Sequence, residues 1–358
     1  MSGARDKSAG SGMGGMADER NTGDRSGMSD KSDTGVKSLV CITDCDHGHI
    51  DEEKQVFAAH GVVYRLEQCK TEEDLLTHCA DSVYWINQYA PVTRAVMEAL
   101  PGLRLVVRYG VGVDNIDLAA ATALGVRVSN VPDYGMQEVA DQALTFFMAL
   151  SRKLILMNDW TKHHQWDHKK SIPIRRLSLT TVGLLGLGRI GKNFAAKVHA
   201  LGCRTIGYDV NADVFLDPAI PFVEKSTFEE VLRQSDAVMI FLPLDRARNL
   251  IDRAALGLMK PSAFLINTSR GGIVNEADLD EALKNGTIAG AAFDVLAKEP
   301  AALDNPLLQN ENFICTPHMA WYSEESAVEL KRKAAEEAVS YMLHGTCRYP
   351  VNQPPAPR

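Results

Sequence analysis

Three residues in the C-terminal half of the chain have side chains suited to one reaction. Arg270, Glu299 and His318 each follow a short apolar run typical of a buried strand, and open α/β sheets bind ligands where strands end. A guanidinium pairs with a carboxylate and polarises the adjacent carbonyl. An imidazole exchanges protons near neutral pH, and a carboxylate bound to it orients the ring and favours its charged form. Together the three predict reduction of a 2-oxo acid by hydride, with His318 as proton donor and, in reverse, as base.

Each of these residues also has an ordinary explanation when taken alone. An arginine after a strand is more often half of a surface ion pair, and a glutamate before a proline usually lies in a solvated turn. A lone loop histidine is as often a satisfied structural residue as a functional one. The combination of all three residues favours a catalytic site over these separate explanations.

A glycine-rich turn marks where the hydride carrier could bind. It lies between an apolar run, 181–185, and a stretch with apolar residues at helical spacing, so it opens a helix after a strand. Its N–H groups and the helix dipole would face a pyrophosphate. Its first glycine allows the tight turn, its second lets the phosphates approach, and its third permits close packing of helix and strand. The turn reads Gly186-Leu187-Gly188-Arg189-Ile190-Gly191.

The next apolar run, 204–208, ends in Asp209. An acidic residue at about this offset meets the adenosine ribose hydroxyls in dinucleotide-binding folds. Its carboxylate would repel a 2′-phosphate, so the sequence predicts NAD rather than NADP.

The elements that must position these residues alternate between strand and helix, which predicts an α/β protein with two Rossmann-like or flavodoxin-like parallel-sheet domains and a cleft between them. We expect a substrate-binding domain at 37–131 plus 319–352 and an NAD-binding Rossmann domain at 132–318. A long helix should span 135–157, a loop 163–170, and a final helix, 323–343, should pack back on the first unit. The other predicted strands are 38–43, 62–65, 82–86, 103–107, 126–128, 237–242, 263–267, 288–293 and 313–315; the other predicted helices include 52–60, 72–79, 93–100 and 118–124.

Composition excludes several classes of protein. Of 358 residues, 45% are hydrophobic, which is ample for two cores, and the net charge of −8 gives no reason to expect nucleic acid or an anionic membrane as a partner. No apolar run approaches the roughly 20 residues that span a bilayer. The seven scattered cysteines predict a reducing, cytoplasmic location. Residues 1–36 are poor in large apolar side chains, so we expect a disordered tail without a secretion signal.

Five motifs in order resemble the D-2-hydroxyacid dehydrogenase family, over about residues 37–352. They are Gly110-Val111-Gly112-Val113-Asp114-Asn115-Ile116-Asp117, the glycine turn above, Ser269-Arg270-Gly271-Gly272, Glu299-Pro300 and Pro317-His318. The resemblance implies the catalytic roles for Arg270, Glu299 and His318 and a homodimer built on the 135–157 helix. It also implies that Asp294 binds the nicotinamide carboxamide, that Leu242, Pro243 and Thr268 line the cofactor cleft, and that the Val111-Gly112 backbone holds the substrate carboxylate.

Within that family the chain is most similar to the C-terminal-binding-protein-like branch of NAD-sensing corepressors. The likeness lies in residues 314–324 and in Arg108, and it implies that Trp321 packs on the substrate and that Arg108 reaches its carboxylate. Trp321 also fits an ordinary interface aromatic. Tyr109 stands where many relatives have a small or aliphatic residue, and Val111 is closer to ordinary dehydrogenases than to the corepressors. An NAD(H)-sensing binding protein with weak or no turnover is therefore the alternative to an enzyme.

The substrate stays open at this stage. Trp321 favours an apolar or thioether side chain, while glyoxylate, hydroxypyruvate and phosphoglycerate-type substrates are possible; Glu299 disfavours formate dehydrogenase, which has Gln there. Five other histidines could suggest a metal, but no carboxylate or cysteine spacing supports it, so they are interpreted as solvated loop residues and no metal is expected. They are His47, His49, His163, His164 and His168.

Overall fold

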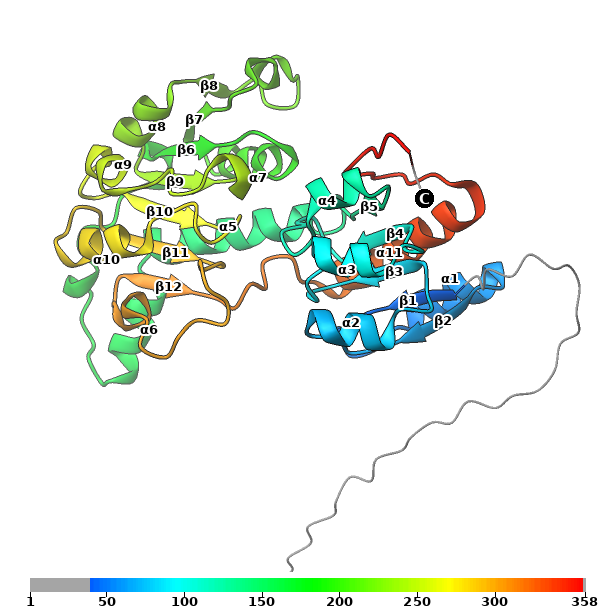
Figure 1. Cartoon of the computed structure of the whole chain (residues 1–358). Coiled ribbons are helices and arrows are strands. Elements are labelled where there is room, and N and C mark those ends of the chain that lie inside the picture. Colours follow the sequence, from blue (N-terminus) through cyan, green and yellow to red (C-terminus); the bar gives the residue numbers. More distant parts are fainter. Residues whose placement is uncertain (1–38, 357–358) are drawn as a thin grey trace, which may run out of the picture. The chain divides into compact units, whose positions relative to one another are not determined.

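The first of two parallel sheets lies in the N-terminal part of the chain. We describe residues 39–356 from a computed structural model (Figure 1); the tail predicted at 1–36 falls outside them. Five strands pair in the order β2-β1-β3-β4-β5, all parallel. They are β1 (Leu39–Ile42), β2 (Val63–Leu66), β3 (Tyr84–Asn87), β4 (Leu105–Arg108) and β5 (Arg127–Ser129).

Helices cover both faces of this sheet because successive side chains of a strand point to opposite sides. Val40 and Ile42 pack with α1 and α11, whereas Cys41 between them packs with α2, α3 and α4. The helices are α1 (Asp51–His60), α2 (Glu72–His78), α3 (Arg94–Ala99), α4 (Leu118–Ala123) and α11 (Glu324–His344).

The second sheet has seven parallel strands in the order β12-β11-β10-β9-β6-β7-β8. The chain runs outward from β6 to β8 and then returns to β9 on the other side of β6. The order therefore reverses between β6 and β9, which is where open α/β sheets bind ligands. The strands are β6 (Thr181–Leu185), β7 (Arg204–Tyr208), β8 (Val223–Lys225), β9 (Ala237–Ile240), β10 (Phe264–Asn267), β11 (Gly290–Phe293) and β12 (Phe313–Cys315).

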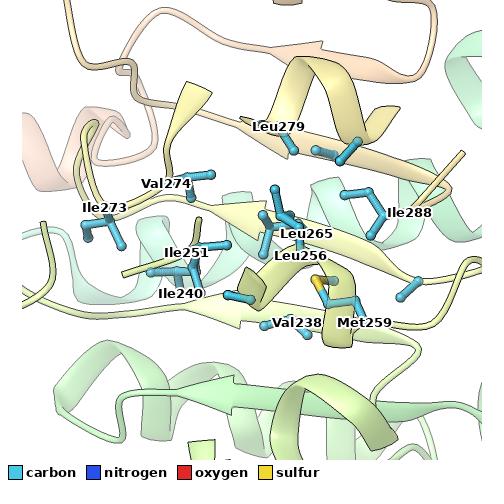
Figure 2. Close-up of a cluster of buried hydrophobic side chains, with 14 of the residues drawn as sticks. Val238, Ile240, Ile251, Leu256, Met259, Leu265, Ile273, Val274, Leu279 and Ile288 are labelled. Carbon is cyan, nitrogen blue, oxygen red and sulfur yellow. The ribbon is translucent and has the colours of Figure 1, made fainter. Parts of the chain in front are cut away.

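Two apolar cores sandwich the second sheet. Val238, Ile240 and Leu265 belong to the cluster drawn in Figure 2, together with Leu256 and Leu279 from the flanking helices. The opposite face packs on α5 and α7. The helices are α5 (Met136–Ser151), α6 (Leu154–Lys162), α7 (Arg189–Ala200), α8 (Phe228–Gln234), α9 (Arg253–Leu258) and α10 (Glu276–Lys284), with short 3-10 turns at Lys169–Ser171, Leu177–Leu179, Ala212–Leu216, Leu244–Arg246 and Pro306–Gln309.

Local sequence signals explain where several of these helices begin. Thr71 and Thr227 each accept a hydrogen bond from the third residue of the following helix, whose acidic side chain binds back to the cap. Gly61 ends α1 in the left-handed conformation, with φ of 65°, which glycine adopts without a steric cost. None of the described helices is long and apolar enough to cross a membrane.

The final helix, α11, returns to the first sheet as predicted, beside α1, β3 and β4 (Figure 1). Leu330, Ala334 and Ala338 are buried there. The predicted α/β class with two parallel sheets is confirmed.

The prediction of one helix over 135–157 is wrong, because the structure has two helices there, α5 and α6. They meet at Lys153, whose φ of 50° is left-handed and cannot continue a helix. The apolar pattern persists across the break, but the two helices use it differently. Phe146, Phe147 and Leu150 of α5 are buried, whereas α6 buries none of its residues.

Candidate active site

The glycine turn leads from β6 into α7 at the point where the strand order reverses. Gly186 has φ of 96°, and a Cβ there would collide with the carbonyl of Phe241. A Cβ at Gly191 would collide with the carbonyl of Gly186, whereas one at Gly188 would meet nothing within 4 Å. The turn is therefore tight at its first glycine, close-packed at its third and open at its second, as a bound pyrophosphate requires.

The start of α7 also fits an anion. Gly188 is the N-cap and provides no capping side chain, and Arg189 and Ile190 form the first turn. The first N–H groups of a helix need acceptors, and a phosphate supplies them.

Asp209 lies at the carboxyl end of β7, as expected. Its Oδ2 accepts a hydrogen bond from Leu187 N at 2.8 Å, and its Oδ1 accepts one from Asn211 N at 2.9 Å. The carboxylate is thus fixed beside the glycine turn, where it can meet a ribose.

The predicted cofactor-lining residues follow neighbouring strands. Leu242 and Pro243 come after β9, and a Cβ on Gly186 would lie 3.1 Å from Leu242 Cδ2. Thr268 follows β10 and has a buried Oγ1 without a hydrogen-bond partner among the described residues. Such an orphaned hydroxyl fits a ligand contact, since buried polar atoms are rarely left unsatisfied.

His318 lies in a turn that Asp294 holds in place. The His318 backbone has φ of 55°, a left-handed conformation that is strained for a residue with a side chain. Its N–H donates to the Asp294 carbonyl at 2.8 Å, and the Asp294 carboxylate accepts from Thr316 Oγ1, Met319 N and Ala320 N. Asp294, predicted to contact nicotinamide, is only 1% exposed and fixes the turn that presents the imidazole.

Glu299 and His318 are in direct contact, as predicted. Glu299 Oε2 lies 2.6 Å from His318 Nδ1, and Oε1 accepts from Leu296 N at 2.9 Å. Burial raises the pKa of the Glu299 carboxyl, but the hydrogen bond and charge of His318 outweigh it, so the net pKa lies below its ordinary value. The carboxylate is therefore ionised at neutral pH and binds His318 through Nδ1, so Nε2 is the ring nitrogen that it does not contact.

Arg270 connects the two sheets. Its Nε donates to Asp114 Oδ2 at 3.1 Å, and its Nη1 donates to the Ser269 carbonyl at 2.8 Å. A Cβ on Gly112 would collide with Arg270 Nη2, so this glycine lets the guanidinium lie against the backbone of the loop that contains Val111. The structure thus brings together the cation and the loop expected to bind a carboxylate.

Arg108, at the end of β4, is a partly buried cation. Its Nε has no hydrogen-bond partner among the described residues, and burial lowers the pKa of its guanidinium. A Cβ on Gly110 would lie 3.3 Å from Tyr134 Oη and would collide with Arg108 Nη1. The arrangement leaves a positive charge available for an anionic ligand.

Trp321 lies in a cluster of aromatic rings, three residues after His318. Its ring is 6.0 Å from Tyr134, 5.6 Å from Tyr322 and 5.5 Å from His47, between centroids. The interpretation of His47 as a solvated residue is wrong, because its side chain is only 6% exposed and also packs on Tyr109.

Sequence reasoning missed three neighbours of the site: His47, Asp114 and Tyr134. Asp114 lies inside a motif already identified, and its type and position beside the loop expected to bind a carboxylate could have marked it as the arginine partner. His47 and Tyr134 gave no such signal, since their roles depend on contacts between distant segments.

Comparisons with known proteins place the chain among dehydrogenases. Residues 144–320 match the family described as D-isomer specific 2-hydroxyacid dehydrogenase, NAD binding domain. The D-3-phosphoglycerate dehydrogenase of Methanocaldococcus jannaschii is 35% identical over 292 residues, which cover 80% of this chain and 55% of that protein. The chain thus spans about half the length of that relative.

A second relative matches over most of its length. The glycerate dehydrogenase of Methylorubrum extorquens is 34% identical over 269 residues, covering 73% of this chain and 82% of that protein. Among solved structures, the NAD complex of a D-isomer specific 2-hydroxyacid dehydrogenase from Lactobacillus delbrueckii ssp. bulgaricus has a TM-score of 0.73 at 26% identity, covering 88% of this chain and 100% of that one.

Proposed function

The chain belongs to the D-isomer specific 2-hydroxyacid dehydrogenase family, whose NAD-binding domain it contains, and on that premise we propose that it interconverts a small 2-oxo acid and its D-2-hydroxy acid. The observation that carries the proposal is the 2.6 Å contact between His318 Nδ1 and Glu299 Oε2, in a site where Arg270 lies against Gly112. This arrangement supplies a positioned proton donor beside an anion-binding cation.

In this proposal the residues act on different parts of the substrate. The carboxylate binds the 111–112 backbone, Arg270 and Arg108, which aligns the 2-oxo carbonyl. When bound, the nicotinamide supplies the hydride. His318 donates its Nε2 proton to the carbonyl oxygen as negative charge develops there, and Glu299 stabilises the ring's orientation and charge. Trp321 packs on the substrate side chain.

The cofactor assignments rest on matching chemistry. We assign the pyrophosphate to residues 186–191, the ribose hydroxyls to Asp209, and the nicotinamide half to Thr268, Asp294 and the 242–243 segment. The division into a substrate-binding part, 37–131 plus 319–352, and an NAD-binding part, 132–318, belongs to the same proposal.

Assembly and location are also proposals. Leu154 and Ile155 of α6 are 63% and 51% exposed, which supports burial against a second copy in a homodimer. All seven cysteines are free thiols, which supports the cytoplasm as the location. The likeness to the C-terminal-binding-protein-like branch stays a prediction.

The test is NADH consumption by purified protein with a panel of 2-oxo acids: glyoxylate, hydroxypyruvate, pyruvate, phenylpyruvate and 4-methylthio-2-oxobutyrate. We expect turnover of at least one of them, with the D-hydroxy acid as product by chiral chromatography. Tight NADH binding without turnover of any of them would instead favour the NAD(H)-sensing protein.

A further inference from the structure

His47 lies at a second place where strand order reverses. In the first sheet β1 lies between β2 and β3. The chain therefore passes from β1 to β2 on one side and then crosses to β3 on the other side of β1. His47 follows β1 at this position. Its side chain is 6% exposed, and its Nε2 is buried without a hydrogen-bond partner among the described residues. A buried nitrogen without a partner destabilises the fold, and a ligand that binds it would offset that cost.

The surroundings of His47 connect it to the substrate site. Its ring is edge-on to Trp321 at 5.5 Å and to Tyr109 at 5.4 Å. The charge of Arg108 acts on the imidazole, and Arg108 Nε is itself buried without a partner among the described residues. The unsatisfied His47 Nε2 therefore belongs to a ring that packs on Trp321.

The loop that carries His47 is fixed in place. Asp46 N donates to Gln88 Oε1 at 2.8 Å, and Gln88 Nε2 donates back to the Asp46 carboxylate. Gln68 Nε2 donates to the Cys45 carbonyl at 2.8 Å. A ring held in this way is preorganised for one contact.

The groups around the ring define which hydrogen bond Nε2 can make. Burial lowers the pKa of His47; Asp46 opposes this, and Lys331, Arg108 and His49 add to it, so the ring is neutral at pH 7. Its Nδ1 lies 3.7 Å from Asp46 Oδ1, and the carboxylate favours the proton on that nitrogen. Nε2 is then an acceptor.

We propose that His47 is a specificity-determining residue that accepts a hydrogen bond from a hydroxyl group on the substrate side chain. The proposal rests on the function proposed above and names the substrate class as hydroxyl-bearing 2-oxo acids. A substrate with an aliphatic side chain would leave His47 Nε2 without a hydrogen bond. A substrate with a second carboxylate would place an acceptor oxygen against the acceptor Nε2, which is repulsive. This substrate class differs from the apolar or thioether side chain that Trp321 alone favours.

The experiment compares hydroxypyruvate with pyruvate, which lacks only the hydroxyl, by NADH consumption. The wild type should prefer hydroxypyruvate by at least about tenfold in kcat/KM. His47→Phe keeps a ring of similar shape and should abolish the preference through a raised KM for hydroxypyruvate, with pyruvate little changed. His47→Gln, which keeps an acceptor, should restore part of it.

His49→Gln is the matched control, because His49 lies in the same loop and its side chain is 55% exposed; it should leave both substrates unchanged. An equal loss for both substrates in His47→Phe with no rescue by His47→Gln, or a wild type that reduces 2-oxo acids without preferring hydroxypyruvate, would overturn the inference alone. Absence of turnover with every 2-oxo acid would overturn the proposed function and this inference with it.

Discussion

At the scale of single residues, the site depends on groups whose partners fix their orientation. Glu299 has one oxygen on His318 and the other on the backbone of Leu296, so the imidazole has one position to occupy. Asp294 adds a second restraint through the backbone of the same turn. Such preorganisation lowers the cost of reaching the transition state.

Asp209 gives a prediction about cofactor choice. Asp209→Asn removes the charge that repels a 2′-phosphate but keeps an oxygen for Leu187 N. The preference for NADH over NADPH in kcat/KM should therefore fall by roughly tenfold. Asp213→Asn, an exposed neighbour, should leave the preference as in the wild type. An unaltered preference in the Asp209→Asn variant would remove Asp209 from the ribose site.

Gly112 gives a prediction about the substrate. Gly112→Ala places a Cβ against the Arg270 guanidinium, which must then move. The expected result is a loss of at least about tenfold in kcat/KM for the 2-oxo acid, with NADH affinity retained, measured by steady-state kinetics and fluorescence titration. Gly257→Ala, where a Cβ meets nothing within 4 Å, serves as the control. Equal kinetics in the two variants would show that Arg270 does not depend on this contact.

At the scale of elements, β4 and α1 are connected by a buried pair. Tyr109, just after β4, donates a hydrogen bond to Glu53 Oε1 in α1 at 2.7 Å, and Glu53 Oε2 has no partner among the described residues. Burial raises the pKa of the Glu53 carboxyl above its ordinary value, although the Tyr109 hydrogen bond opposes this. The same tyrosine packs on His47, so this pair also supports the site.

The raised pKa of Glu53 predicts a pH-dependent stability. The protonated form is favoured in the folded state, so its contribution is present below the unfolded pKa of about 4.3 and is lost as pH rises through the folded value. Glu53→Gln does not titrate and should be more stable than wild type by about 1 kcal/mol at pH 8. The difference should shrink towards pH 5 in urea unfolding, whereas exposed Glu73→Gln should show none. A variant that is less stable to the same extent at both pH values would contradict this.

The sequence predicts elements well where apolar periodicity and packing agree. Strands β6, β7 and β12 have their predicted bounds, and α11 differs by one residue at each end. The break between α5 and α6 was missed because Leu154 and Ile155 continue the apolar pattern although they are exposed. Strand β8 was missed because three residues with one buried side chain carry too little pattern.

At the scale of the whole molecule, the proposed site joins segments that are distant in the sequence. His47 follows β1, Arg108 and Gly112 lie at and just after the end of β4, Arg270 follows β10, and the residues after β12 supply His318. The charge and type of the proposed catalytic residues were readable from sequence, since each stands after a strand in a recognisable motif. Contacts such as Arg270 with Asp114 were not, because they depend on how the loops of both sheets meet.

The most direct test of this account is the His318→Ala variant, measured for both turnover and NADH binding. We predict that kcat/KM falls by about 10³-fold while the NADH dissociation constant stays within about twofold, because the imidazole acts on the transition state. The control His163→Ala, an exposed histidine, should match the wild type. Retained turnover in His318→Ala, or a loss of NADH binding as large as the loss of turnover, would contradict the assignment of His318 as the proton donor.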